Sequence, residues 1–243
     1  MMKRLLSRAA TMLLLLLAAA TTTEAQVPVY CGEHKYDGEH NNEVSGYLQL
    51  GNNIVTGKYI GPAVTYTRHL NSHFTAEAGL DLPFGKGKAG FYTKGSYRLS
   101  ASYFNFYFSG KLLYNRYTDF HTNEYNANLS TSVETPYFEL TLGETLIHYS
   151  LMGTGYTEPL TLTFGTGVNI RPRWNSWNLG LFLRNYDDFY YENWNINWGV
   201  RWMANLRHRM KLYGELNIRP AGSTSQLATR YEASLKIGLK YVW

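Results

Sequence analysis

The sequence contains one cysteine, Cys31, in 243 residues, and this excludes an internal disulfide framework. Beyond residue 25 it has no apolar run near the roughly 20 residues that a membrane-spanning helix needs, and its mean hydropathy is −0.32. Segments with the 3.6-residue period of an amphipathic helix are also missing. We therefore expect a fold stabilised by strands alone.

Other absences restrict the function. The formal net charge of +5 falls to +3 when residues 1–25 are set aside, a surplus too small to indicate nucleic-acid binding. No glycine-rich phosphate loop is present, and Cys31, His34 and His40 do not have the spacing of a closed zinc site. The sequence therefore predicts no cofactor, no bound metal and no nucleic-acid partner.

The N-terminus has the pattern of a secretory signal. Three basic residues, Lys3, Arg4 and Arg8, precede an apolar run at 12–20, and the small residues before Gln26 fit a signal-peptidase site. About nine apolar residues are too few for an uncleaved membrane anchor. We predict a removed signal peptide over 1–25, a periplasmic lead-in over 26–43 and one β domain over 44–243.

Within 44–243 the dominant pattern has a period of two. In residues 193–206, Trp194, Trp198 and Trp202 alternate with asparagine, glycine and arginine. Successive side chains of an extended chain point to opposite faces, so this segment has one apolar face and one polar face. The pattern recurs in about twelve segments, which are joined alternately by short and mostly longer links.

This pattern predicts an all-β protein, a transmembrane antiparallel up-and-down β-barrel of about 12 strands. A soluble β-sandwich is the competing fold. It would place three indoles from one strand in a dry core, where each N–H needs a partner. A soluble closed barrel of twelve strands would be too wide to fill with apolar side chains.

The signal segment, the alternating segments of about ten residues and the terminal Trp243 together resemble the outer-membrane β-barrel proteins of Gram-negative bacteria. The resemblance implies an outer-membrane location, contact with outer-membrane lipid, and recognition of the C-terminal strand by the barrel-assembly machinery. Tryptophans are expected at the membrane interfaces of such a barrel. These interface residues are Trp174, Trp177, Trp194, Trp202 and Trp243.

The polar face predicts a small porin-like channel for small solutes, or a structural outer-membrane protein. The residues expected to line the lumen are Lys94, Arg98, Arg184, Arg201, Glu215, Arg230, Glu232 and Lys236. Side chains that pair across the lumen could equally close it, and the sequence does not decide between these states. Asp187 and Asp188 are interpreted as a solvated loop tip. The outer loops, 186–193 among them, leave an adhesion or receptor barrel as an alternative.

A second alternative is an outer-membrane lipid hydrolase. His148 and Ser150 lie two residues apart, about 6.6 Å along a strand, and resemble the His-x-Ser of outer-membrane phospholipase A and lipid A deacylases. The resemblance implies Ser150 as nucleophile and His148 as base. However, Glu144 would lie about 13 Å from His148, too far to orient it. The preferred interpretation is a β-bulge at 143–145 that turns both side chains into the lumen, with no catalytic residue assigned.

Overall fold

The computed structural model describes residues 41–53, 57–82, 87–101, 103–118, 121–151, 153–171, 176–191, 196–207, 209–221 and 230–243. The predicted signal peptide and all but the last three residues of the predicted lead-in lie outside these ranges, as do Trp174 and Trp194. The described residues contain no helix that is long and apolar enough to cross a membrane.

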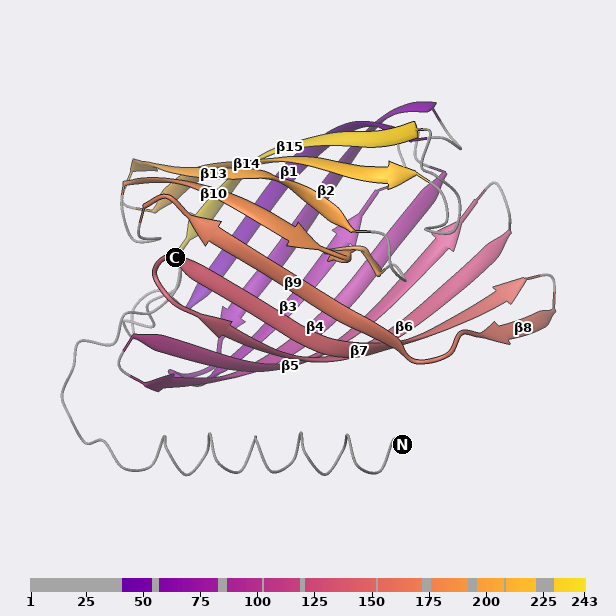
Figure 1. The fold of residues 1–243 in the computed structure, drawn as a ribbon, viewed down its shortest axis with the longest axis horizontal. Helices are drawn as coiled ribbons and strands as arrows, with labels where there is room; N and C mark the ends of the chain where they lie inside the picture. Colours follow the sequence, from indigo (N-terminus) through magenta and orange to yellow (C-terminus); the bar gives the residue numbers. More distant parts are fainter. Residues whose placement is uncertain are drawn as a thin grey trace.

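The described strands form a closed antiparallel barrel with twelve wall strands, which confirms the predicted fold (Figure 1). Consecutive strands pair with each other, and the first pairs with the last to close the barrel from Glu43↔Val242 to Asn52↔Ala233. The wall strands are β1 (Asn42–Asn53), β2 (Gly57–His69), β3 (Phe74–Asp81), β4 (Lys88–Ala101), β5 (Phe104–Tyr117), β6 (Thr122–Glu134), β7 (Phe138–Leu151), β8 (Thr154–Thr157) with β9 (Thr161–Asn169), β10 (Trp177–Arg184), β13 (Asn197–Arg207), β14 (Met210–Ala221) and β15 (Arg230–Val242).

The eighth wall strand is in two pieces. Both β8 and β9 pair with the same edge of β7, and between them the Glu158 amide still donates to the Ile147 carbonyl at 2.9 Å. Pro159 follows, and a proline cannot donate to a strand ladder. The strand is therefore interrupted at Pro159 while the wall stays continuous.

Apolar side chains cover the outside of the barrel and polar side chains fill the inside. Leu112 and Leu129 are 64% and 74% exposed on the outer face, while Asn115 and Asn197 are fully buried on the inner face. This arrangement is the reverse of a soluble domain and is that of a barrel surrounded by lipid. Both ends of the barrel domain lie at one rim, since the Asn42 amide donates to the Trp243 carbonyl at 3.0 Å. Short turns such as 70–73 occupy the same rim, which is the periplasmic one in barrels with an even strand count.

The predicted β-bulge at 143–145 is wrong. The register between β6 and β7 runs without a shift from Thr122↔Leu151 to Glu134↔Glu139. Gly143 is needed for another reason, because a Cβ there would lie 2.4 Å from the Leu129 carbonyl oxygen. With the alternation intact, His148 and Ser150 lie on the outer, lipid-facing side rather than in the lumen.

Candidate functional site

The candidate site is the interior of the barrel, where the chain between β10 and β13 folds inward. We refer to residues 185–191 as the lumen segment; it contains the two-residue strands β11 (Tyr186–Asp187) and β12 (Tyr190–Tyr191). The wall strand β10 ends at Arg184, which pairs with Gly165, so the β9 residues 161–164 toward the outer rim have no partner in β10. The chain therefore leaves the wall part of the way up the barrel.

Asn185 stabilises the point where the chain leaves the wall. Its side-chain amide donates to the Leu162 carbonyl at 2.7 Å, and its side-chain oxygen accepts from the Phe164 amide at 2.8 Å. The backbone amide of Asn185 also donates to the Phe164 carbonyl at 3.1 Å. This one residue thus satisfies backbone groups of β9 that a longer β10 would have paired with.

Aromatic side chains of the lumen segment are buried against the barrel wall. The Phe189 ring lies edge-on to the Tyr92 ring with centroids 5.1 Å apart, and both residues belong to a buried apolar cluster with Leu113. The wall is recessed where they pack. A Cβ on Gly90 would lie 2.9 Å from the Phe189 ring, and one on Gly165 would lie 2.9 Å from the Tyr186 ring.

Two wall lysines bind the backbone of the lumen segment. The Lys88 ammonium donates to the Phe189 carbonyl at 2.6 Å, and the Lys111 ammonium donates to the Asp188 carbonyl at 2.5 Å. The Tyr47 hydroxyl donates to the Asp188 carboxylate at 3.2 Å. Because β4 and β5 lie across the closed sheet from β10 and β13, the two lysines fix the segment to the opposite wall, and Tyr47 adds a contact from β1.

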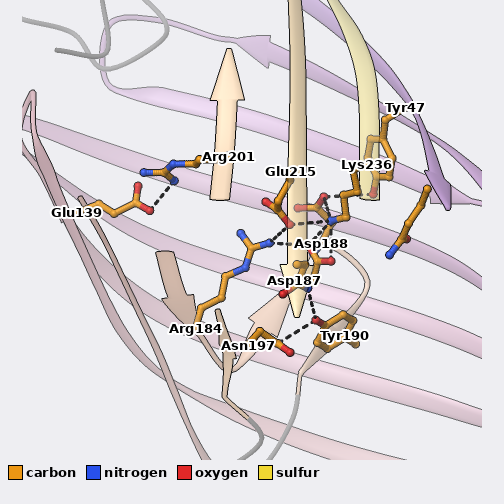
Figure 2. A network of polar contacts seen from close by, with 12 residues as sticks. Tyr47, Glu139, Arg184, Asp187, Asp188, Tyr190, Asn197, Arg201, Glu215 and Lys236 are labelled. Carbon is orange, nitrogen blue, oxygen red and sulfur yellow. Dashed lines mark hydrogen bonds and ion pairs between the residues drawn. The ribbon is translucent and has the colours of Figure 1, made fainter. Parts of the chain in front are cut away.

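An ionic network fixes Asp187 to the side of the barrel formed by β10, β14 and β15 (Figure 2). The Lys236 ammonium donates to both carboxylate oxygens of Asp187, at 2.5 and 2.6 Å, and the Arg184 guanidinium lies 3.3 Å from the same carboxylate. Arg184 also pairs with Glu215 at 2.6 Å. Burial alone would raise the pKa of the Asp187 carboxyl, but Lys236 and Arg184 outweigh it and hold that pKa well below its ordinary value. Asp187 therefore remains charged in the lumen.

The interpretation of Asp187 and Asp188 as a solvated loop tip is wrong about their position, because both line the larger cavity inside the barrel, and the Asp188 side chain is 47% exposed there. Asp187 is only 5% exposed and lies inside the barrel. The aromatic run Phe189, Tyr190 and Tyr191 directly after the two aspartates was the available sequence signal, because three aromatic residues are not typical of a solvated tip.

The lumen segment lies between two cavities. The larger, of about 440 Å³, extends toward the periplasmic rim and includes Ser72 in its lining. The smaller, of about 190 Å³, lies toward the opposite rim and is lined by Tyr59, Tyr117 and Phe189, among others. Asp187 lines both cavities, as does Tyr47. The segment therefore crosses the lumen at the boundary between an inner and an outer compartment.

Most residues expected in the lumen lie around these two cavities. Arg201 pairs with Glu139 across β7 and β13 at 2.6 Å, and Arg219 pairs with Glu232. The side chain of Arg230 lies outside the described residues. Lining the larger cavity are Lys94, Arg98, Arg184, Arg201, Glu215 and Lys236, and Glu232 lines the smaller one. The sequence did not indicate Lys88, Lys111 or Tyr47 as contacts of an inward-folded loop.

The described tryptophans lie on the outer face. Trp243 stacks on Tyr241 at the periplasmic rim with ring centroids 5.8 Å apart, and the Arg171 guanidinium lies 3.8 Å from the centre of the Trp177 ring. Trp202 lies opposite Gly214 in the middle of β13 and not at a strand end. A Cβ on Gly214 would lie 1.9 Å from the Trp202 ring, so the indole covers the backbone of β14.

His148 and Ser150 have no catalytic partner among the described residues. The His148 ring bonds through Nδ1 to the Thr157 hydroxyl at 2.8 Å, and its ring centroid lies 6.3 Å from that of Tyr125. No carboxylate of the described residues contacts this ring. The same part of the chain contains no group of three His, Cys, Asp or Glu side chains that could hold a metal ion.

No family model matches the sequence, and no curated protein matches it either. Solved structures do match its fold. The KdgM porin in complex with disordered oligogalacturonate aligns with a TM-score of 0.55 at 12% identity, covering 83% of this chain and 99% of that one. The outer membrane protein Omp33 of Acinetobacter baumannii aligns at 0.52 with 12% identity, covering 84% and 98%. The translocator domain of the autotransporter NalP from Neisseria meningitidis aligns at 0.50 with 16% identity, covering 85% and 90%.

These comparisons and the barrel geometry agree on the fold of the protein. The chain has the fold of outer-membrane β-barrel proteins, and its exposed apolar outer face fits a location in an outer membrane. At these identities the likeness concerns the fold.

Proposed function

We propose that the protein is a porin-like outer-membrane channel for small polar solutes, whose passage is limited by the lumen segment. The position of this segment between the inner and outer cavities supports the proposal. Solutes that cross the barrel would have to pass Asp187 and Tyr47, which line both cavities. The surrounding Lys94, Arg98, Arg184, Arg201, Glu215, Glu232 and Lys236 would line their path.

The same proposal covers the parts of the chain that precede the barrel. We infer that residues 1–25 direct secretion and are removed, that 26–43 lead from the periplasm into the barrel, and that the C-terminal strand with Trp243 is recognised by the barrel-assembly machinery. N-terminal sequencing of protein extracted from outer membranes should begin at Gln26. A mature protein that retains residues 12–20 would contradict this inference.

Conductance of single barrels in a planar bilayer tests the channel. We expect the refolded mature wild type to give small discrete conductance steps. Replacing residues 186–191 by a short Gly-Ser linker should give larger steps, because it removes the side chains that cross the lumen. Heat-modifiable migration on gels would show that both proteins are folded. Equal conductance of two folded barrels would contradict a limiting role of the segment.

The lipid-hydrolase alternative has no specific support from the geometry. His148 and Ser150 face lipid, and the contacts of the His148 ring are with Thr157 and Tyr125. A nucleophile of this kind needs an oriented base. The adhesion alternative also loses part of its predicted surface, because 186–191 lies in the lumen and not in an outer loop.

A further inference from the structure

The outer surface of β5 to β8 has a polar row just above an aromatic row. The aromatic row joins Tyr114, Tyr125 and His148, which are direct partners across β5, β6 and β7. Below it the same face is apolar, with Leu112 and Leu146 exposed. Aromatic rings at strand ends mark the membrane–water interface, so the next row toward the outer rim lies at the height of lipid headgroups.

That next row consists of hydrogen-bond donors and one cation. Arg116 is paired in register with Asn123, and Asn123 with Ser150. Neighbouring strands are about 4.8 Å apart, so the three side chains span roughly 10 Å along the barrel surface. The Tyr114 hydroxyl donates to the Asn123 side-chain oxygen at 2.9 Å, which leaves the Asn123 side-chain NH₂ group available as a donor.

His148 is turned toward this row. A Cβ on Gly155, the register partner of Ser150, would lie 3.0 Å from Cε1 of the His148 ring and 3.4 Å from its Nε2. The ring therefore lies against Gly155, and the glycine leaves the space for it. Because Nδ1 bonds to Thr157, Nε2 is the nitrogen that remains available, and it lies against Gly155 beside Ser150, at the β8 end of this row.

Arg116 differs from the described arginines of the lumen. Arg184 and Arg201 each have a carboxylate oxygen at 2.6 Å, whereas no carboxylate of the described residues pairs with Arg116. Its neighbour Glu124 points to the opposite face and is buried. An exposed guanidinium at headgroup height, with an amide on the next strand and hydroxyl and imidazole groups on the strand after it, is complementary to a phosphate group.

We propose that Arg116, Asn123, Ser150 and His148 form a binding site for the phosphate of an outer-leaflet lipid. Arg116 supplies the charge and the other three supply hydrogen bonds. The acyl chains lie along the apolar surface of Leu112 and Leu146 below the aromatic row. This arrangement gives the His148–Ser150 pair a role in lipid binding that needs no catalytic partner.

Lipid titration of the refolded mature barrel in neutral detergent, read by native mass spectrometry, tests the site. The probe is diphosphoryl lipid A. Arg116→Gln should weaken its binding about tenfold, the effect of losing a charged hydrogen-bond pair. Arg68→Gln is the matched control, because Arg68 is also exposed on the outer face but lies at the periplasmic end of β2. It should bind like the wild type.

Two further arms identify the lipid as the source of the phosphate. Dephosphorylated lipid A should bind the wild type about as weakly as lipid A binds Arg116→Gln, and inorganic phosphate at matched concentration should not displace lipid A. Equal binding of the two arginine variants, or of the two lipids, would overturn the proposal, as would full displacement by inorganic phosphate. Channel conductance should be unchanged in Arg116→Gln, so that this test is independent of the lumen segment.

Discussion

Replacing Lys236 by methionine should release the lumen segment. Methionine keeps much of the apolar length of the lysine side chain but removes the ammonium that donates to both oxygens of Asp187. Both side chains are nearly inaccessible, at 4% and 5% exposure. In Lys236→Met the Asp187 carboxylate therefore stays buried, and its remaining contacts are the Arg184 guanidinium at 3.3 Å and the Asp188 backbone amide, which donates to it at 2.8 Å.

The expected magnitude follows from the loss of one partner of a buried ion pair, which is strongly destabilising at about 3–5 kcal/mol. Arg184 remains beside Asp187, and the adjoining cavities can admit water. We therefore expect the loss of Lys236 to destabilise the inserted segment by about 2–3 kcal/mol. That energy shifts the equilibrium between the inserted and displaced segment by roughly 30- to 150-fold. The fraction of time in a high-conductance state should rise by this factor until it saturates.

The assay is single-channel recording of the refolded barrel. Lys240→Met is the matched control, because Lys240 also points inward from β15 but pairs with Glu43 at 2.8 Å, away from the lumen segment. The double variant Asp187→Asn with Lys236→Met removes both charges and should return most of the way to wild-type behaviour. Equal open fractions in Lys236→Met and Lys240→Met would show that the effect comes from the lost lumen charge and not from the contact between Lys236 and Asp187.

Gly90→Leu should displace the Phe189 ring and enlarge the conductance, whereas Gly95→Leu on the outer face of the same strand, where a Cβ meets nothing within 4 Å, should not. Asn185→Ala leaves the Leu162 carbonyl and the Phe164 amide without their side-chain partner, so folding should weaken by about 1–3 kcal/mol and the Phe164 amide should exchange faster with solvent. Glu144→Leu should stabilise the barrel against urea in lipid vesicles by about 1–2 kcal/mol, because Glu144 faces lipid between Leu142 and Leu146. The control Glu139→Leu should destabilise the barrel, because it removes the partner of Arg201. A Glu139→Leu barrel more stable than the Glu144→Leu barrel would contradict this assignment of faces.

The barrel wall could be predicted from the sequence because each wall strand is constrained on both faces. Lipid selects apolar residues outside and the lumen selects polar residues inside, so the period of two persists along the strand. The predicted segment 193–206 corresponds to β13 (Asn197–Arg207), and its Trp198 is 51% exposed on the outer face. An alternation of this kind identifies both the strand and its outer face.

The bulge prediction failed because Glu144 interrupts the apolar face of β7. A carboxylate in the hydrocarbon region is unfavourable, so a change of register at 143–145 was the simpler interpretation of the sequence. The structure instead keeps thirteen consecutive residue pairs between β6 and β7 and leaves Glu144 opposite Leu129. The free energy of the unbroken hydrogen-bond ladder between β6 and β7 outweighs the cost of one unfavourable side chain. The residue pattern of β7 alone cannot show this balance.

The lumen segment could not be found from local sequence because its contacts come from distant strands. Lys236 and Asp187 are 49 residues apart, Lys111 and Asp188 are 77 apart, and Lys88 and Phe189 are 101 apart. Each of these lysines has the same parity as other inward residues of its strand. The residues next to it in the sequence do not show whether it contacts the lumen segment or is solvated in the lumen. The two aspartates look solvated by themselves, and only the closed barrel brings Lys236 and Tyr47 to them. Whether a polar loop of such a barrel extends outward or folds inward therefore depends on where the opposite wall places its cations.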